Sequence, residues 1–195
     1  MEGQELYELI CARRSCRAYT EEQAPRDLLN RVLDAGRLAP SGMNVQQCHF
    51  IVVQRPELLE KLRVLIQQIF AGMDAKSVNP MLERAITLAK EGRHNFFYGA
   101  PTLIVVANKR ENGNNLADSA AAMQNMMLMA TALGLGNCWV NNLRWNGEAP
   151  PVRRFLEEIG VQEDEGVYGS LALGYAVTTH QEALPRTGNA VDIVD

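Results

Sequence analysis

The sequence predicts an α+β fold in which helices cover both faces of a small sheet. Three observations support this prediction. Helical and strand-like segments are interleaved along the chain, only about four segments have the pattern of a strand, and the helical content exceeds what a doubly wound parallel sheet would need. We therefore expect an α+β sandwich rather than a doubly wound sheet.

The bulk composition indicates one folded domain over residues 1–195. Hydrophobic residues make up 47% of the chain and charged residues 22%, which is typical of a globular protein, and no repeat or linker marks a boundary. The net charge of −4 argues against a nucleic-acid partner, because phosphate binding depends on clustered Lys and Arg. No apolar run is long enough to span a bilayer and the acidic N-terminus is unlike a secretory signal, so we expect a cytoplasmic protein.

The first half of the chain has the pattern of helices around one strand. Leu6, Leu9 and Ile10 form the apolar stripe of a first helix, and Pro25 suits the start of a second. The β-branched segment 49–54 predicts a strand, and a third helix is expected over 58–69. Glycine, asparagine and proline interrupt residues 70–99, where only 81–91 has a helical pattern. This region is a candidate mobile cover.

The second half begins with an apolar strand over 102–107. The segment 116–133 is apolar nearly all the way round, which predicts a central buried helix. We expect an extended run over 137–143, a short helix over 152–159 and a strand over 168–176. The segment after residue 178 has apolar residues but no helical period, so it either frays or lies on a partner.

Several common kinds of site are absent from the sequence. There is no P-loop, no H-E-x-x-H and no G-x-S-x-G. The glycines of 134–136 fail as a dinucleotide fingerprint, because Trp139 stands where the third glycine belongs and a helix precedes them. The histidines and cysteines show no metal spacing, so we expect no metal. The cysteines are expected to be reduced thiols, with a Cys11–Cys16 redox pair as the alternative to plain packing.

Three arginines and a serine lie within five residues of an otherwise acidic chain: Arg13, Arg14, Ser15 and Arg17. The planar guanidinium group makes bidentate hydrogen bonds to phosphate and does not lose its charge. If the first helix continues through this segment, Arg13 and Arg17 lie one turn apart on one face. The segment is a candidate phosphate site, although a solvated helix end that stabilises the macrodipole has the same composition.

A polar loop joins the second helix to the first strand. It offers hydroxyl, amide and main-chain donors that would suit the edge of a flat heteroaromatic ring, but ordinary turn chemistry explains the same residues. The candidate residues are Pro40, Ser41, Gly42, Asn44 and Gln46. Further along, Gly134 and Gly136 would allow close approach of the main chain to a ligand, while a helix C-cap followed by a strand explains them nearly as well.

Together and in this order, these segments resemble the nitroreductase family. That family shows R-x-S-x-[KR] at the end of the first helix, P-S-x-x-N-x-Q before the first strand and A-L-G-L-G-x-C-W after the central helix. It also shows a late L-x-L-G-Y strand followed by a basic residue. The chain matches these five features at 13–17, 40–46, 132–139, 171–175 and Arg186. One such motif is weak, but five in order are specific, and they cover nearly all of the chain apart from 70–99.

The resemblance implies a three-layer sandwich with a mixed, mainly antiparallel sheet, and an intertwined homodimer that holds FMN between its subunits. By carry-over, Arg13, Arg14 and Ser15 would hold the FMN phosphate and ribityl chain, with help from Arg186. Arg17 would lie near the pyrimidine carbonyl edge of the flavin. A fixed cation there favours two-electron chemistry, because the reduced ring carries negative charge.

The other implied contacts come from the partner subunit and from the third strand. Ser41, Gly42 and Asn44 of the partner would line the opposite side of the cofactor, and a C-terminal arm over about 178–195 would wrap the other subunit. The main chain near the flavin N5 would belong to Val140, Asn141 and Asn142. No protein residue is needed as a catalyst of the hydride step.

The implied function is hydride transfer from NAD(P)H through FMN to nitroaromatics, quinones or similar small acceptors. Gln47-Cys48 replaces a frequent Pro-Trp of the family, and Asn142 replaces an acidic or small residue, so substrate preference cannot be transferred. One alternative is another reaction on the same fold, such as dehalogenation, flavin breakdown or metabolite dehydrogenation. The other is a non-catalytic flavin-binding protein.

Overall fold

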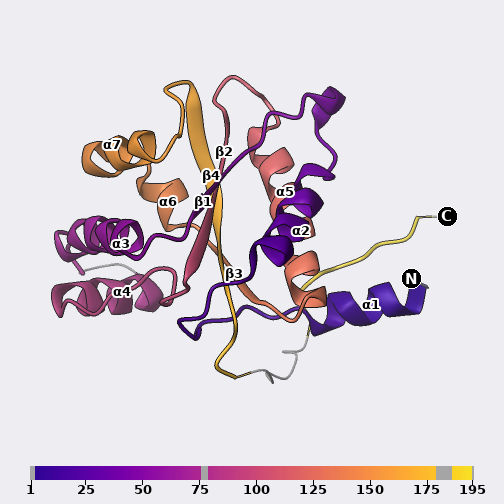
Figure 1. Ribbon diagram of the computed structural model, residues 1–195, viewed down its shortest axis with the longest axis horizontal. Helices are drawn as coiled ribbons and strands as arrows, with labels where there is room; N and C mark the ends of the chain where they lie inside the picture. Colours follow the sequence, from indigo (N-terminus) through magenta and orange to yellow (C-terminus); the bar gives the residue numbers. More distant parts are fainter. Residues whose placement is uncertain (1–2, 76–78, 179–185, 195) are drawn as a thin grey trace.

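The computed structural model describes residues 3–75, 79–178 and 186–194. Over these residues the chain forms an α+β sandwich, with a four-stranded sheet between two layers of helices (Figure 1). The predicted fold class is therefore confirmed. The arm predicted over 178–195 lies outside the described residues at 179–185 and 195, and residues 186–194 have no regular secondary structure.

The helices and strands follow the predicted order closely. The strands are β1 (His49–Val53), β2 (Thr102–Lys109), β3 (Gly136–Val140) and β4 (Glu165–Gly174). The helices are α1 (Gly3–Ala12), α2 (Arg26–Arg37), α3 (Pro56–Ala71), α4 (Pro80–Lys90), α5 (Asn115–Ala132), α6 (Asn142–Asn146) and α7 (Pro150–Glu158), and a short 3₁₀ helix spans Gly42–Asn44.

The strand order is β1-β2-β4-β3, and all three pairings are antiparallel. The expected mixed sheet is therefore antiparallel among its four strands. The one parallel pairing in the described part of the chain is an isolated bridge between Ser15 and Asn137, outside the named strands. β3 is an edge strand, and this bridge lies on its open side.

The sheet separates two apolar cores. Side chains alternate along β2, so Leu103 and Val105 belong to one core while Ile104 and Val106 belong to the other. The first core lies under α3, α4, α6 and α7, and the second lies under α2 and α5 (Figure 1). A strand that packs on both faces cannot alternate between apolar and polar residues, which explains the continuous apolar run of β2.

The central helix α5 is buried as predicted, with Met123 and Met126 fully inaccessible. Its close packing on α2 depends on Gly36, where a Cβ atom would lie 2.9 Å from Met126 Cγ. The methionines of this helix are therefore core residues.

Two predictions about local structure need correction. The extended run ends at Val140, whose carbonyl accepts a hydrogen bond from Ser170 Oγ at 3.0 Å, and α6 begins at Asn142. This turn of helix buries Leu143 in the first core, which an extended chain would not do. In the predicted cover, α4 packs on α3 and buries Ile86, so it belongs to the helical layer.

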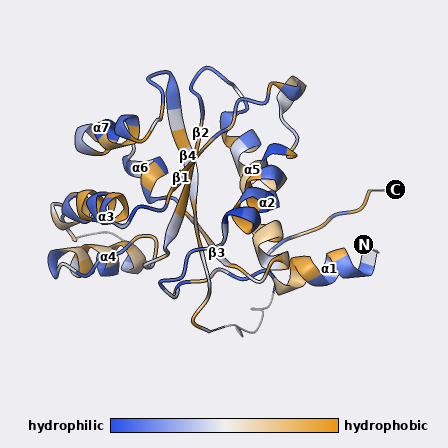
Figure 2. Ribbon diagram, viewed as in Figure 1, coloured by the Kyte–Doolittle hydropathy of each residue, from blue (hydrophilic) through white to orange (hydrophobic). Residues whose placement is uncertain are grey.

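α1 and the segment 186–194 extend to the same side of the molecule, and both carry apolar residues (Figures 1 and 2). No helix in the described ranges combines the length and the hydropathy that crossing a membrane would need.

Candidate functional site

The arginine-rich segment is extended, because α1 ends at Ala12. The backbone N–H of Cys16 donates to the carbonyl of Asn137 at 2.8 Å, so the segment lies along the open edge of β3. The first helix does not continue through this segment, so Arg13 and Arg17 do not lie one helical turn apart. The open edge of a strand carries backbone N–H and C=O groups that need hydrogen-bond partners. The arginine-rich segment pairs with some of these groups on β3.

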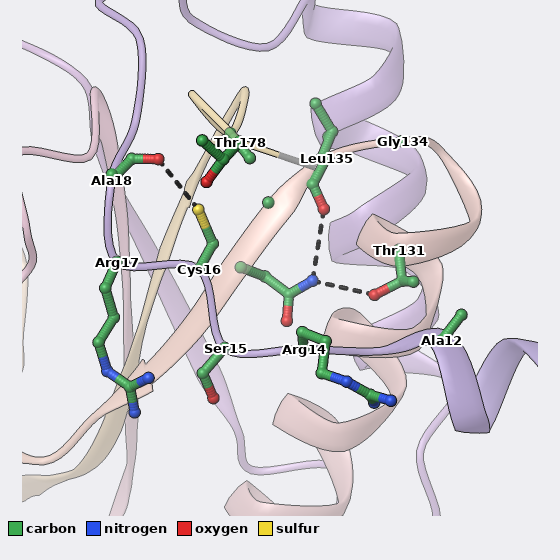
Figure 3. A pocket seen from close by; sticks show the side chains of 13 residues that line it. Ala12, Arg14, Ser15, Cys16, Arg17, Ala18, Thr131, Gly134, Leu135 and Thr178 are labelled. Carbon is green, nitrogen blue, oxygen red and sulfur yellow. Dashed lines mark hydrogen bonds between the residues drawn. The ribbon is translucent and has the colours of Figure 1, made fainter. Parts of the chain in front are cut away.

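A hollow of about 740 Å³ opens between this segment, β3 and the end of α5; we call it the arginine hollow. Figure 3 shows the side chains of Ser15 and Arg17 pointing to one side of the extended segment and that of Cys16 to the other. The residues that line it are Ala12, Arg14, Ser15, Cys16, Arg17, Ala18, Thr131, Gly134, Leu135, Gly136, Asn137, Ala176 and Thr178.

Gly136 allows the two backbones of this wall to meet. A Cβ atom at that position would lie 2.9 Å from Cys16 Sγ and 3.1 Å from Cys16 Cβ. Any larger residue would therefore push the arginine-rich segment away from β3. The close approach seen at Gly136 is to the protein's own chain. Its predicted approach to a ligand stays a prediction.

The positive charge of the cluster is concentrated. Burial, together with the neighbouring charges of Arg14 and Arg186, lowers the pKa of Arg13. Arg186 therefore lies near Arg13, as the resemblance implied, although the two are far apart in sequence. Within the described residues, no ion pair neutralises these three guanidinium groups. Like charges held together without carboxylates favour an anionic ligand.

Two buried polar atoms of the arginine hollow lack a hydrogen-bond partner in the described part of the chain: Arg14 Nε and Asn137 Oδ1. Arg14 is held by a bond from Nη1 to the carbonyl of Arg13 at 2.6 Å, and Asn137 Nδ2 donates to Thr131 Oγ1 at 3.1 Å. Buried polar groups are ordinarily paired. One free donor and one free acceptor beside a cluster of cations suit a ligand that carries both an anion and hydroxyl groups.

The polar loop lines a second hollow of about 290 Å³, which we call the loop hollow. Its walls come from α2, α5, β1 and the loop itself, and are formed by Gly36, Arg37, Ala39, Pro40, Ser41, Gln46, Cys48, Phe50, Asp118 and Ala122. Of the predicted loop residues, Pro40, Ser41 and Gln46 line it, while Asn44 is exposed.

The loop has an unusual backbone. Met43, Asn44 and Gln46 have φ values of 52°, 56° and 52°, in the left-handed region that non-glycine residues rarely adopt. The hydroxyl of Ser41 accepts a hydrogen bond from the Gln46 N–H at 3.1 Å, and the Met43 side chain is 94% exposed. Strain of this kind is retained where the surroundings hold the chain in place, and it is concentrated at functional sites.

The remaining predicted residues lie at the end of β3. Val140 is buried, Asn141 Oδ1 accepts from the indole of Trp139 at 2.8 Å, and Asn142 begins α6. None of the three lines either hollow. Within one chain, Arg14 and Arg17 line the arginine hollow, whereas the polar loop lines the loop hollow; Arg13 and Arg186 line neither.

Two residues at the site were missed by the sequence analysis. Asn137 stands in the middle of a recognised motif, but nothing in its sequence context shows that its oxygen is left unpaired. Tyr98 lies in a region without a clear pattern, yet its ring centroid is 5.8 Å from Arg17 Cζ. Only the folded chain brings these groups to the site.

All four cysteines are free thiols in the structure. Burial raises the pKa of Cys138 and of Cys48, which makes both poor nucleophiles. Cys11 and Cys16 are free, and the Cys16 thiol donates to the carbonyl of Ala18 at 3.2 Å. Among the described residues, no group of three or more His, Cys, Asp or Glu side chains could hold a metal ion.

A sandwich of this topology with a basic hollow at its edge strand matches a known class of oxidoreductase. The family model described as the nitroreductase family matches residues 10–175, and the chain belongs to that family. The expected family is thus confirmed, and with it the assignment of the chain as an enzyme.

Solved structures and sequence relatives agree with this assignment. The chain is similar to a nitroreductase with bound FMN from Bacteroides fragilis, at 37% identity and a TM-score of 0.87, over 97% of this chain and 99% of that one. A nitroreductase with bound FMN from Desulfitobacterium hafniense is 28% identical with a TM-score of 0.84, over 100% of both chains. Iodotyrosine deiodinase 1 of Rattus norvegicus is 32% identical over 110 residues, which are 54% of this chain and 38% of that protein.

Proposed function

We propose that the protein binds FMN in the arginine hollow and uses it to transfer hydride from NAD(P)H to a small acceptor such as a nitroaromatic or a quinone. The observation that carries the proposal is the group of three unneutralised arginines beside the buried free atoms Arg14 Nε and Asn137 Oδ1. FMN offers a phosphate, ribityl hydroxyl groups and a ring with polar edges, which match these groups in kind. The FMN bound to the two similar nitroreductases supports the same ligand.

Arg14, Ser15 and Arg17 line the hollow, Arg13 and Arg186 do not, and each would have a distinct task. Arg13, Arg14 and Arg186 would neutralise the phosphate, and Ser15 would donate a hydrogen bond to it or to the ribityl chain. Arg17 would lie at the pyrimidine edge, where a fixed cation stabilises negative charge. The bound flavin supplies the hydride chemistry, and the protein residues bind it and orient it.

The polar loop would contact FMN only in a homodimer, where it would reach the cofactor of the other subunit. Ser41, Gly42 and Asn44 line or border a hollow other than the arginine hollow, so they would reach the flavin of a partner subunit in a homodimer. The main chain of 140–142 would lie near the flavin N5. A two-fold dimer would bring each loop to the other subunit's cofactor.

Exposed apolar side chains support such a dimer. On α1, Leu6, Tyr7 and Ile10 are 44%, 62% and 49% exposed, and Figure 2 shows apolar colour on this helix. In the segment 186–194, Val191 and Ile193 are also largely exposed. Apolar side chains gathered on projecting segments favour contact with another chain. We propose that the C-terminal arm wraps the partner.

The purified protein tests this function directly. It should bind FMN and become yellow, and it should elute from a size-exclusion column as a dimer. It should also oxidise NADH or NADPH faster when a nitroaromatic or quinone is added. Arg14→Ala should bind FMN more weakly, and Arg84→Ala on α4 is its matched control, since this exposed arginine lies on the opposite helical layer. A protein that stays colourless after incubation with FMN would contradict the proposal.

A second reaction is favoured by one observation, the 32% identity to iodotyrosine deiodinase 1 over about half of this chain. The same hollow and flavin would then serve reductive dehalogenation of a halogenated aromatic amino acid. Adding iodotyrosine to the acceptor assays decides between the two. Release of iodide without turnover of nitroaromatics or quinones would favour the second reaction.

A further inference from the structure

Arg17 differs from the other arginines of the cluster in having an aromatic neighbour. Its Cζ lies 5.8 Å from the centroid of the Tyr98 ring. The neighbouring Tyr98 side chain raises the pKa of Arg17, against the opposing effect of burial. Among the described residues no carboxylate pairs with Arg17, so the tyrosine is its principal partner. A cation near an aromatic ring is attracted to its π system.

Tyr98 is itself firmly placed. The two residues before it, Phe96 and Phe97, are buried in the first core, with their rings in edge-to-face contact at 5.0 Å. Backbone bonds close turns on either side: Tyr98 N–H donates to Asn95 O at 3.2 Å, and Ala100 N–H donates to Phe97 O at 3.1 Å. The turn leads directly into β2. The tyrosine side chain therefore projects from a rigid support.

The backbone at Tyr98 is strained. Its φ of 60° lies in the left-handed region, where a side chain clashes with the backbone and glycine is favoured. Gly99, which follows, has a φ of 73°. A tyrosine at a position better suited to glycine indicates that the side chain has a function there.

We propose that Tyr98 is a positioning residue that holds the Arg17 guanidinium at the wall of the arginine hollow. This inference rests on the proposed function, in which Arg17 lies beside the pyrimidine edge of FMN. The free arginine side chain has many rotamers, and an aromatic ring beside the guanidinium restricts them. Because the reduced flavin carries more negative charge than the oxidised form, a well-placed cation favours binding of the reduced form. Tyr98 would thus act on the flavin through Arg17.

The test is the substitution Tyr98→Leu, which removes the aromatic ring beside the Arg17 guanidinium. We expect the ratio of affinities for reduced and oxidised FMN to fall about tenfold, since the aromatic contact that positions the cation is lost. That fall lowers the two-electron midpoint potential of bound FMN by about 30 mV. Tyr168→Leu is the matched control, because this half-buried tyrosine of β4 lies near Arg110 and Glu148 instead, and it should leave the potential unchanged.

A double-mutant cycle separates positioning from a general structural effect. If Tyr98 acts through Arg17, then Tyr98→Leu should have no further effect on the potential in an Arg17→Ala background. An equal shift in both backgrounds would overturn the inference. The inference would also be overturned if Tyr98→Leu had the same potential and the same FMN affinity as the unmodified protein. Failure of the unmodified protein to bind FMN would instead overturn the proposed function, so the two failures are distinguishable.

Discussion

The backbone N–H of Gly42 donates a hydrogen bond to Asp118 Oδ1 at 3.1 Å, which ties the strained polar loop to the central helix α5. The other carboxylate oxygen accepts from Asn112 Nδ2 at 3.1 Å, and Asp118 is only 6% exposed. The loop that is proposed to reach a partner's flavin is therefore held by a buried, fully paired carboxylate. Pre-organising a binding loop in this way reduces the entropy lost on binding.

Gly42→Ala should displace this loop. A Cβ atom at Gly42 would lie 2.2 Å from Asn114 Nδ2, so either the loop or the asparagine must move. We expect a loss of about 1–3 kcal/mol in the free energy of unfolding and weaker FMN binding. Urea denaturation and FMN titration measure the two effects. Gly113→Ala is the control, because a Cβ there meets nothing within 4 Å. Equal behaviour of the two variants would contradict the prediction.

Asp118→Asn should weaken the same anchor by another route. The substitution removes the charge and places an amide N–H₂ group where Asn112 or Gly42 now donates. We expect a loss of about 1–3 kcal/mol in unfolding free energy, because a buried donor loses its acceptor. Thermal or urea denaturation checks this value. The control is Asp34→Asn, since Asp34 is 61% exposed and pairs only with Arg37 at the surface. Comparable losses in both variants would refute a special role for Asp118.

Arg14→Ala should weaken FMN binding by about 10- to 100-fold, because a charge-assisted contact to phosphate is lost. Riboflavin lacks the phosphate, so its affinity should change much less. The free energy of unfolding should fall much less than the free energy of FMN binding, since the substitution also relieves repulsion with Arg13. Fluorescence titration with both flavins measures the contrast. An equal loss of affinity for FMN and riboflavin would place Arg14 away from the phosphate.

Glu165 should make the stability of the protein depend on acid pH. Burial opposes ionisation of this carboxyl group, but the hydrogen bond from His49 at 2.9 Å, the Gln162 N–H and the charge of Lys109 outweigh it and lower the pKa of Glu165 below its ordinary 4.5. A depressed pKa in the folded state stabilises the protein above the unfolded-state pKa, and this stabilisation is lost as the pH falls through the folded-state pKa.

The substitution Glu165→Gln tests that pH dependence. It should cost about 2 kcal/mol of unfolding free energy at pH 7, since bonds to a charged acceptor are lost. The difference from the unmodified protein should begin to shrink as the pH falls below the unfolded-state pKa, and it should level off once the pH has fallen through the lowered folded-state pKa. Urea denaturation at several pH values checks this. A difference that stays constant down to pH 3 would show that ionisation of Glu165 does not contribute.

Much of the fold could be predicted because its signals are local. The β-branched run of β1, the continuous apolar run of β2 and the long apolar helix α5 each carry a pattern that a short window of sequence contains. The end of β3 was harder to predict. Whether the chain continues as a strand or turns into α6 depends on where Leu143 can be buried, and that core comes from other segments.

Some features of the candidate site could likewise be predicted from the sequence, and others could not. The sequence by itself determined which residue types gather in the arginine-rich segment and the polar loop. Charge, hydrogen-bonding capacity and motif order depend only on the residues and on their order in the chain. Only the tertiary structure decided that the arginine segment lies along β3, that Asp118 holds Gly42, and that Tyr98 meets Arg17. Each of these contacts joins segments that are distant in sequence, and a hydrogen bond or an unpaired buried atom exists only once folding has brought its surroundings together.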